Sequence, residues 1–161
     1  MNSMDHAHTR HAGAYWRFAV MLVLSFIAMY VLMYAMVDKF EDVYPNHNQA
    51  YMAALMVAPM AIIELLLMGS MYPRKRVNAL IVVGALLLLA AAWFAIRQQA
   101  AIGDEQFVKS MIPHHSGAIL MCDGAKLQDA ELQQLCTEIS AGQQAEIDQM
   151  RAILGRLGSS S

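Results

Sequence analysis

Side chains that bind soft metal ions gather in the last third of the chain. Met111, His115 and Cys122 fall on one narrow face of a helix that turns by about 100° per residue, and His114 and Met121 flank this face. Imidazole nitrogen together with thioether or thiolate sulfur suits Cu(I), Ag(I) and Zn(II), whereas Ca²⁺ and Mg²⁺ prefer oxygen ligands. The residue types therefore predict a soft-metal site in this region.

Helices must position these residues. Asp104 can begin a short helix, and Pro113 suits the first turn of the next helix, which we expect to run to about Ala125. Asp129 is expected to cap a last helix that ends near Leu157. The apolar face of that last helix carries Cys136, Gln143, Glu146 and Met150.

An antiparallel hairpin that turns near residue 129 brings the two sets of residues together. It places Cys122 opposite Cys136 and His115 opposite Gln143, with Glu146 facing the histidines. The predicted metal ligands are Met111, His114, His115, Met121, Cys122, Cys136 and Met150, supported by Gln143 and Glu146. In a purely structural alternative, the cysteines are small apolar residues or form a disulfide, the methionines fill the core, and the histidines cap the helix.

Composition excludes several functional classes. The chain has 161 residues, a net charge of −2 and no clustered basic stripe, which argues against a nucleic-acid-binding protein. It contains no Ser/His/Asp arrangement, Gly-rich phosphate loop or pair of catalytic carboxylates, so we expect a binding protein and not an enzyme. Only 15% of the residues are charged, against about 25% in a typical soluble domain. A large part of the chain is therefore expected to lie in a lipid bilayer.

Three long apolar runs account for this composition. Each is long enough to cross a hydrocarbon core of about 30 Å as a helix, and tyrosine or tryptophan residues stand near the ends of the runs. The sequence predicts a His-containing cytoplasmic tail at 1–17, a membrane domain at 18–97 with spans at 18–37, 51–72 and 77–96, and a periplasmic helical metal-binding domain at 98–161.

The distribution of lysine and arginine predicts the orientation of the spans. Arg74, Lys75 and Arg76 form a basic loop after the second span, whereas the loop at 38–50 has one lysine and three acidic residues. Positive loops face the cytoplasm. The N-terminus is therefore expected in the cytoplasm and the residues after Arg97 outside it, which for a bacterial inner membrane means the periplasm.

Methionine recurs at helical spacing in the predicted spans. Met52, Met56, Met60 and Met68 follow one another around Glu64 in the second span, and Met29, Met33 and Met36 lie in the first. These residues fill helix interfaces in one interpretation and form a thioether path for Cu(I) in the other. Glu64 is expected near the middle of its span, facing other helices. The tail residues Met4, His6, His8 and His11 either bind metal or are simply solvated.

The soft-ligand region resembles a known family. Its motifs are Phe107-x-x-x-Met111-Ile112-Pro113-His114-His115-Ser116-Gly117-Ala118-Ile119-x-Met121 and Gln143-Gln144-x-Glu146-Ile147-x-x-Met150. These resemble domain of unknown function 305 over about residues 103–157. The resemblance implies a ferritin-like helical domain that binds copper or silver in the periplasm, with ligands at Met111, His114, His115, Met121 and Met150. Longer members of the family carry two such hairpins, whereas this chain has one.

These observations predict an all-α protein. Three membrane helices precede a ferritin-like hairpin, and a homodimer would complete a four-helix bundle. The predicted function is membrane-anchored binding of Cu(I), with Ag(I) or Zn(II) as other candidate ions, for sequestration, handover or tolerance. Two alternatives remain open: copper transport along the methionines and Glu64, and a structural or partner-binding protein with a Cys122–Cys136 disulfide.

Overall fold

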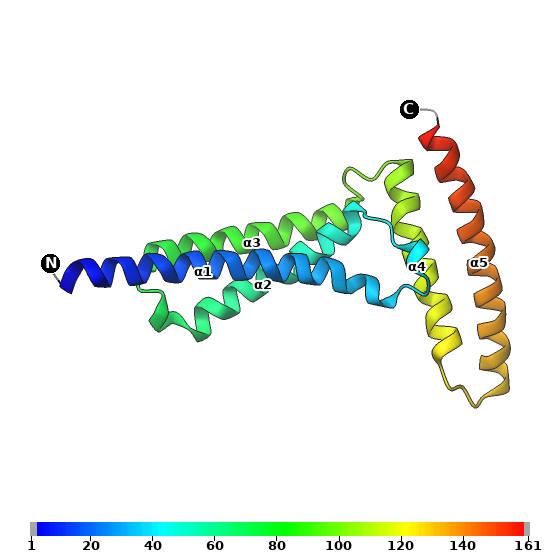
Figure 1. The fold of residues 1–161 in the computed structure, drawn as a ribbon, viewed down its shortest axis with the longest axis horizontal. Coiled ribbons are helices and arrows are strands. Elements are labelled where there is room, and N and C mark those ends of the chain that lie inside the picture. Colours follow the sequence, from blue (N-terminus) through cyan, green and yellow to red (C-terminus); the bar gives the residue numbers. More distant parts are fainter. Residues whose placement is uncertain (1–2, 160–161) are drawn as a thin grey trace. The chain divides into compact units, whose positions relative to one another are not determined.

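The structure is a computed structural model that describes residues 3–159, with side chains from residue 13 onward. The described residues form helices and contain no strand, so the all-α fold class is confirmed. Figure 1 shows the helices in chain order. Their bounds are Ser3–Leu32 (α1), His47–Leu67 (α2), Lys75–Gln98 (α3), Asp104–Gly124 (α4) and Ala130–Gly158 (α5).

Three helices are long and apolar enough to cross a membrane. Their apolar stretches are Gly13–Met36, His47–Leu67 and Lys75–Gln98, which overlap the three predicted spans. The first helix begins at Ser3, well before the predicted start of the first span, so the backbone of the predicted tail is helical from there. The side chains of its methionine and histidines lie outside the described residues.

The second span differs most from its prediction, because it begins and ends earlier along the chain. Asn46 caps its first turn, since the Asn46 Oδ1 atom accepts a hydrogen bond of 2.9 Å from the Gln49 N–H. The helix ends at Leu67, and a short 3₁₀ turn at Gly69–Met71 follows. Glu64 therefore lies in the last turn of α2 and not near the middle of a span.

The chain folds into two compact units. One contains residues up to 31 together with 50–100, and the other contains 32–49 together with the residues from 101 onward. We call the second unit the head. The segment that joins α1 to α2 belongs to the head, although the sequence predicted it only as a loop between two spans.

In the first unit, α1, α2 and α3 meet around a small buried cluster. Its residues are Phe18, Ala61, Leu65, Tyr72 and Ala85. The Phe18 and Tyr72 rings pack in a T-shaped arrangement, with 5.5 Å between their centroids. Most of the apolar surface of these helices stays exposed, as expected for helices that face lipid.

In the head, α4 and α5 form the predicted antiparallel hairpin (Figure 1). The predicted cap of α5 is confirmed, because the Asp129 carboxylate accepts a hydrogen bond of 2.9 Å from the Leu132 N–H. The predicted break before Pro113 is wrong, since α4 runs through this residue without interruption. Proline leaves the carbonyl four residues earlier without its helical donor. That carbonyl, on Lys109, accepts a hydrogen bond of 3.4 Å from Asn46 Nδ2 instead.

Candidate metal site

A packed apolar core holds the hairpin where the soft ligands lie. Ile112 of α4 and Ile147 of α5 have no exposed surface, and Val108 and Ile119 extend the same cluster along α4. The thioether side chain of Met150 packs against this cluster. The core therefore fixes the register between α4 and α5. It also holds Met150 of α5, a predicted ligand, against α4.

His115 and Glu146 meet across this register. The Nδ1 atom of His115 lies 3.0 Å from the Glu146 Oε2 atom. The buried Nδ1 atom has no hydrogen-bond partner among the described residues. Buried polar atoms are normally hydrogen-bonded. In the neutral ring, this nitrogen can therefore accept a cation as a ligand beside the Glu146 carboxylate.

The helical geometry places Met111 beside both histidines. On one helix, residues three and four positions apart are neighbours, with about 5–6 Å between their Cβ atoms. Met111 is thus a neighbour of His114 and of His115, whose ring centroids lie 6.0 Å apart. The contact between His115 and Glu146 also places Met111 across from Met150 in the antiparallel register. Four predicted ligands therefore lie in one short stretch of the hairpin, together with Glu146. They are Met111, His114, His115 and Met150.

Burial controls the protonation of His115. Removal of its imidazole from water lowers the pKa of His115 below the ordinary histidine value. The carboxylate of Glu146 opposes this effect, and the neighbouring His114 adds to it. The neutral ring, which is the form that ligates metals, is therefore favoured at neutral pH.

The remaining predicted ligands lie toward the turn of the hairpin. Met121 is 61% exposed and stands seven residues, about 10 Å along the helix axis, beyond His114. Cys122 and Cys136 are joined in a disulfide, as their predicted opposition allows. A disulfide offers no thiolate, so the expectation that both cysteines ligate metal fails for this oxidised form. Gln143 is half-buried on the face of α5 that carries Glu146.

A polar network around Ser116 of α4 was not predicted from the sequence. The buried carboxylate of Asp42 accepts hydrogen bonds of 2.8 Å from Ser116 Oγ and 2.6 Å from the Arg151 guanidinium. The Asp38 N–H donates to the same Ser116 hydroxyl over 3.0 Å. The signal available in the sequence was Ser116, a polar residue directly after the two histidines. Its partners come from the segment between α1 and α2, which the loop prediction separated from the head.

Two methionines assigned to the first span also belong to the head. Met33 and Met36 form the ends of a 3₁₀ turn in the second unit, so the predicted stripe of the first span is divided after Met29. The Met36 carbonyl oxygen packs so close to α4 that a Cβ atom at Gly117 would lie 3.1 Å from it. Glycine at this position therefore permits the close approach of the segment to α4.

The donors differ from those of a zinc site. Among residues 13–159, no three His, Cys, Asp or Glu side chains are grouped so that they could hold a metal ion. Any ion at this place would need methionine sulfur in addition to His115 and Glu146. Thioether sulfur is a ligand for Cu(I) and Ag(I), so the residues present fit these ions better than Zn(II).

Comparisons with known proteins agree with the motifs. Residues 95–160 match the family described as "Domain of unknown function (DUF305)". The chain is also 34% identical over 138 residues to "Uncharacterized protein L153" of Acanthamoeba polyphaga mimivirus, and this match covers 84% of the chain and 89% of the relative. No solved structure matches the chain. The match to the relative covers 138 residues, whereas the domain match covers only residues 95–160. The match to the relative therefore includes much of the region before residue 95. The chain therefore belongs to the family of proteins that contain a DUF305 domain.

Proposed function

We propose that the head binds Cu(I) through the His115 imidazole and the Met111 and Met150 thioethers, with His114 at the exposed edge. The observation that carries this proposal is the buried His115 Nδ1 atom, which has no hydrogen-bond partner in the described part of the chain. A bound cation would satisfy this atom. The adjacent Glu146 carboxylate would balance the positive charge of the ion.

The proposed role is sequestration or handover of copper, without catalysis. Thioethers and a neutral imidazole hold Cu(I) as a soft cation. The exposed side chain of His114 would give an ion a path between solvent and the half-buried groups. Silver would use the same ligands, because Ag(I) shares the preference of Cu(I) for sulfur.

The proposed location is the inner membrane of a bacterium, with the N-terminus in the cytoplasm and the head in the periplasm. The basic loop Arg74–Arg76 and the acidic segment between α1 and α2 support this orientation. The disulfide supports it as well, since disulfides persist in oxidising compartments. A reporter that works only in the periplasm should be active after Ser161 and inactive within Arg74–Arg76.

The proposed assembly is a homodimer in which two hairpins form a four-helix bundle. Met121, Leu132 and Leu135 leave an apolar surface exposed near the turn of the hairpin, and a second hairpin would cover it. Light scattering of the detergent-solubilised protein should then give the mass of two chains. A single-chain mass would contradict the dimer but not the metal site.

A Cu(I) titration of the full-length protein against a competing chelator tests the metal site. The whole chain is needed, because residues 33–49 form part of the head. His115→Ala and Met150→Ala should each weaken Cu(I) binding at least tenfold, or about 1.4 kcal/mol. Met121→Ala should change it little, because this residue is exposed and lies beyond the other ligands.

Met52→Ala is the matched control, since it removes an exposed thioether from the other unit and should leave the affinity unchanged. Absence of Cu(I) and Ag(I) binding by the wild-type protein would overturn the proposal. A large loss in Met121→Ala instead of Met150→Ala would move the site toward the exposed face of α4.

A further inference from the structure

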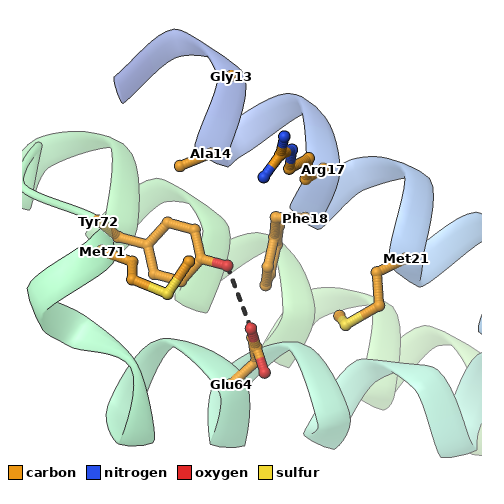
Figure 2. Close-up of a pocket in the computed structure, with 8 residues that line it drawn as sticks. All are labelled: Gly13, Ala14, Arg17, Phe18, Met21, Glu64, Met71 and Tyr72. Atoms are coloured by element: carbon orange, nitrogen blue, oxygen red, sulfur yellow. Dashed lines mark hydrogen bonds between the residues drawn. The ribbon is translucent and has the colours of Figure 1, made fainter. Parts of the chain in front are cut away.

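A cavity in the first unit carries two opposite charges. It lies between the middle of α1, the end of α2 and the turn that follows, and its volume is about 570 Å³. Figure 2 shows Arg17 and Met21 of α1 on one side, with Glu64 and Tyr72 on the other and the Phe18 ring between them. The lining is thus mainly apolar, with one carboxylate and one guanidinium.

The two charges do not neutralise each other. The Glu64 carboxylate accepts a hydrogen bond of 3.1 Å from the Tyr72 hydroxyl group, whereas Arg17 forms no ion pair within residues 13–159. Arg17 is exposed and Glu64 is half-buried, so each charge remains accessible to a ligand of the opposite sign. A ligand that presents a cation to Glu64 and an anion to Arg17 would satisfy both.

The wall of the cavity is held in place by a polar network. The Tyr15 hydroxyl donates a hydrogen bond of 2.8 Å to Asn78 Oδ1, and the Asn78 amide donates one of 2.7 Å to the Tyr72 carbonyl. The Tyr15 and Tyr72 rings also pack together, with 5.4 Å between their centroids. Tyr72 is therefore fixed, and through its hydroxyl group it fixes Glu64.

A shallow apolar groove on the surface of α1 adjoins the cavity. Its lining includes Trp16, Val20 and Leu24, and it shares Arg17 and Met21 with the cavity. The volume of the groove is about 520 Å³. A soluble zwitterion would leave this groove empty, whereas the acyl chain of a lipid would fill it. Trp16 is 71% exposed at the start of the groove, a position typical of the boundary between headgroups and chains.

We propose that this cavity binds a phospholipid whose headgroup carries a primary ammonium. The lipid phosphate lies against Arg17, which pairs well with phosphate oxygens, and the ammonium donates hydrogen bonds to Glu64. One acyl chain lies in the groove along α1. A quaternary ammonium cannot donate to the carboxylate, and a purely anionic headgroup is repelled by it. Phosphatidylethanolamine therefore fits best among common phospholipids.

The test uses the full-length protein, delipidated in detergent and titrated with phosphatidylethanolamine, phosphatidylcholine or phosphatidylglycerol of identical acyl chains. Bound lipid is counted by native mass spectrometry. We expect phosphatidylethanolamine to bind at least about fivefold more tightly than the other two. Equal binding of the three lipids would overturn the proposal, and this comparison needs no variant.

Substitutions separate the two charges. Glu64→Gln should reduce the preference for phosphatidylethanolamine over phosphatidylcholine to within about twofold, because the isosteric amide has no charge. Arg17→Gln should weaken all three lipids, and Arg97→Gln, which removes an arginine that does not line the cavity, should weaken none. A preference that survives in Glu64→Gln contradicts the assigned contact.

Soluble glycerophosphoethanolamine distinguishes a lipid from a free zwitterion. It carries the same charges without acyl chains, so it should fail to displace the bound lipid at equal concentration. Displacement would overturn the assignment of the groove to an acyl chain. Copper binding by the head is a separate measurement, so failure of this proposal leaves the proposed metal site unaffected.

Discussion

At one end of the α4–α5 hairpin Ile112 and Ile147 are fully buried, whereas near its turn Leu132 and Leu135 are each 48% exposed. The first end has an apolar core and a polar network from the segment between α1 and α2. The turn has a disulfide and little buried surface. Packing therefore holds the end that carries the proposed metal ligands, and a covalent bond holds the other end.

The two ends of the hairpin therefore have different roles: the packed end positions the proposed metal ligands, and the turn is stabilised by the disulfide. The packed end keeps His115 and Met150 in a fixed register, which a binding site requires. The disulfide end needs no such precision, because the bond restricts the unfolded chain whatever its neighbours do. The predictions below address the two ends in turn, beginning with the largest expected effect.

The strongest contrast should come from the buried isoleucine. Ile147→Ala should lower the free energy of unfolding of the head by about 2–5 kcal/mol, because it leaves a cavity in the packed core. In the single chain, Leu135→Ala should cost less than about 1 kcal/mol, since its side chain is half exposed there. Hydrogen exchange of α4 and α5 in the full-length protein measures both. Similar losses in the two variants would contradict the comparison.

Reduction of the disulfide should have the next largest effect. The bond closes a loop with a sequence separation of 14, for which about 3 kcal/mol is expected. The double variant Cys122→Ser/Cys136→Ser should lose this amount but keep its Cu(I) affinity within about twofold, because the proposed ligands lie elsewhere. Unfolding curves and chelator competition give the two quantities. A tenfold loss of affinity would show that the metal site depends on the turn of the hairpin.

Loss of the Arg151 guanidinium should have a smaller effect. Arg151→Met should destabilise the head by about 2 kcal/mol, because the buried Asp42 carboxylate keeps Ser116 but loses its charged donor. Lys109→Met is the matched control, since it removes an exposed ion pair with Glu105 and should cost at most about 0.5 kcal/mol. Denaturant unfolding of both variants tests whether the network contributes to the packed end.

The smallest effect concerns the pH dependence of the packed end. Because the folded pKa of His115 is lowered, the folded state binds fewer protons than the unfolded state at mildly acid pH. Its contribution to stability is therefore complete above the ordinary pKa of about 6.5 and is lost as the pH falls below that value. In the metal-free protein, an NMR titration should place the His115 midpoint below 6.5.

Glu146→Gln should shift this midpoint further down, because the carboxylate favours the charged ring. An upward shift in this variant would show that Glu146 does not act on His115 through its charge.

Local sequence patterns were sufficient to predict the helices and the hairpin. Asp129 at the start of an apolar stripe predicted the beginning of α5, and helical spacing predicted that Cys122 faces Cys136. The three apolar runs predicted the three long helices, although the end of α2 at Leu67 shows that Gly69 was a stronger stop than the apolar residues around it. These features depend on neighbours in the sequence.

Contacts between distant segments were not predicted. The sequence predicted that a helix begins at Pro113, whereas α4 continues through this residue. The donor that satisfies the Lys109 carbonyl is Asn46, which lies 63 residues earlier and could not be recognised from local sequence. In the sequence, Asp42 served only as one of the acidic loop residues that predict the orientation of the spans. Its partner Arg151 follows 109 residues later. The contacts of the connecting segment with α4 and α5 therefore had no signal in the neighbouring sequence.

The ion pair between Asp42 and Arg151 can form only late in the synthesis of the chain. Arg151 leaves the ribosome after Asp42 by 109 residues, which takes about 5–20 s at 5–20 residues per second. During this interval the α2 and α3 segments are made, and the Asp42 carboxylate is without its guanidinium. A chain whose synthesis stops before Arg151 cannot complete the network, so the last helix determines when the first connecting segment reaches its final conformation.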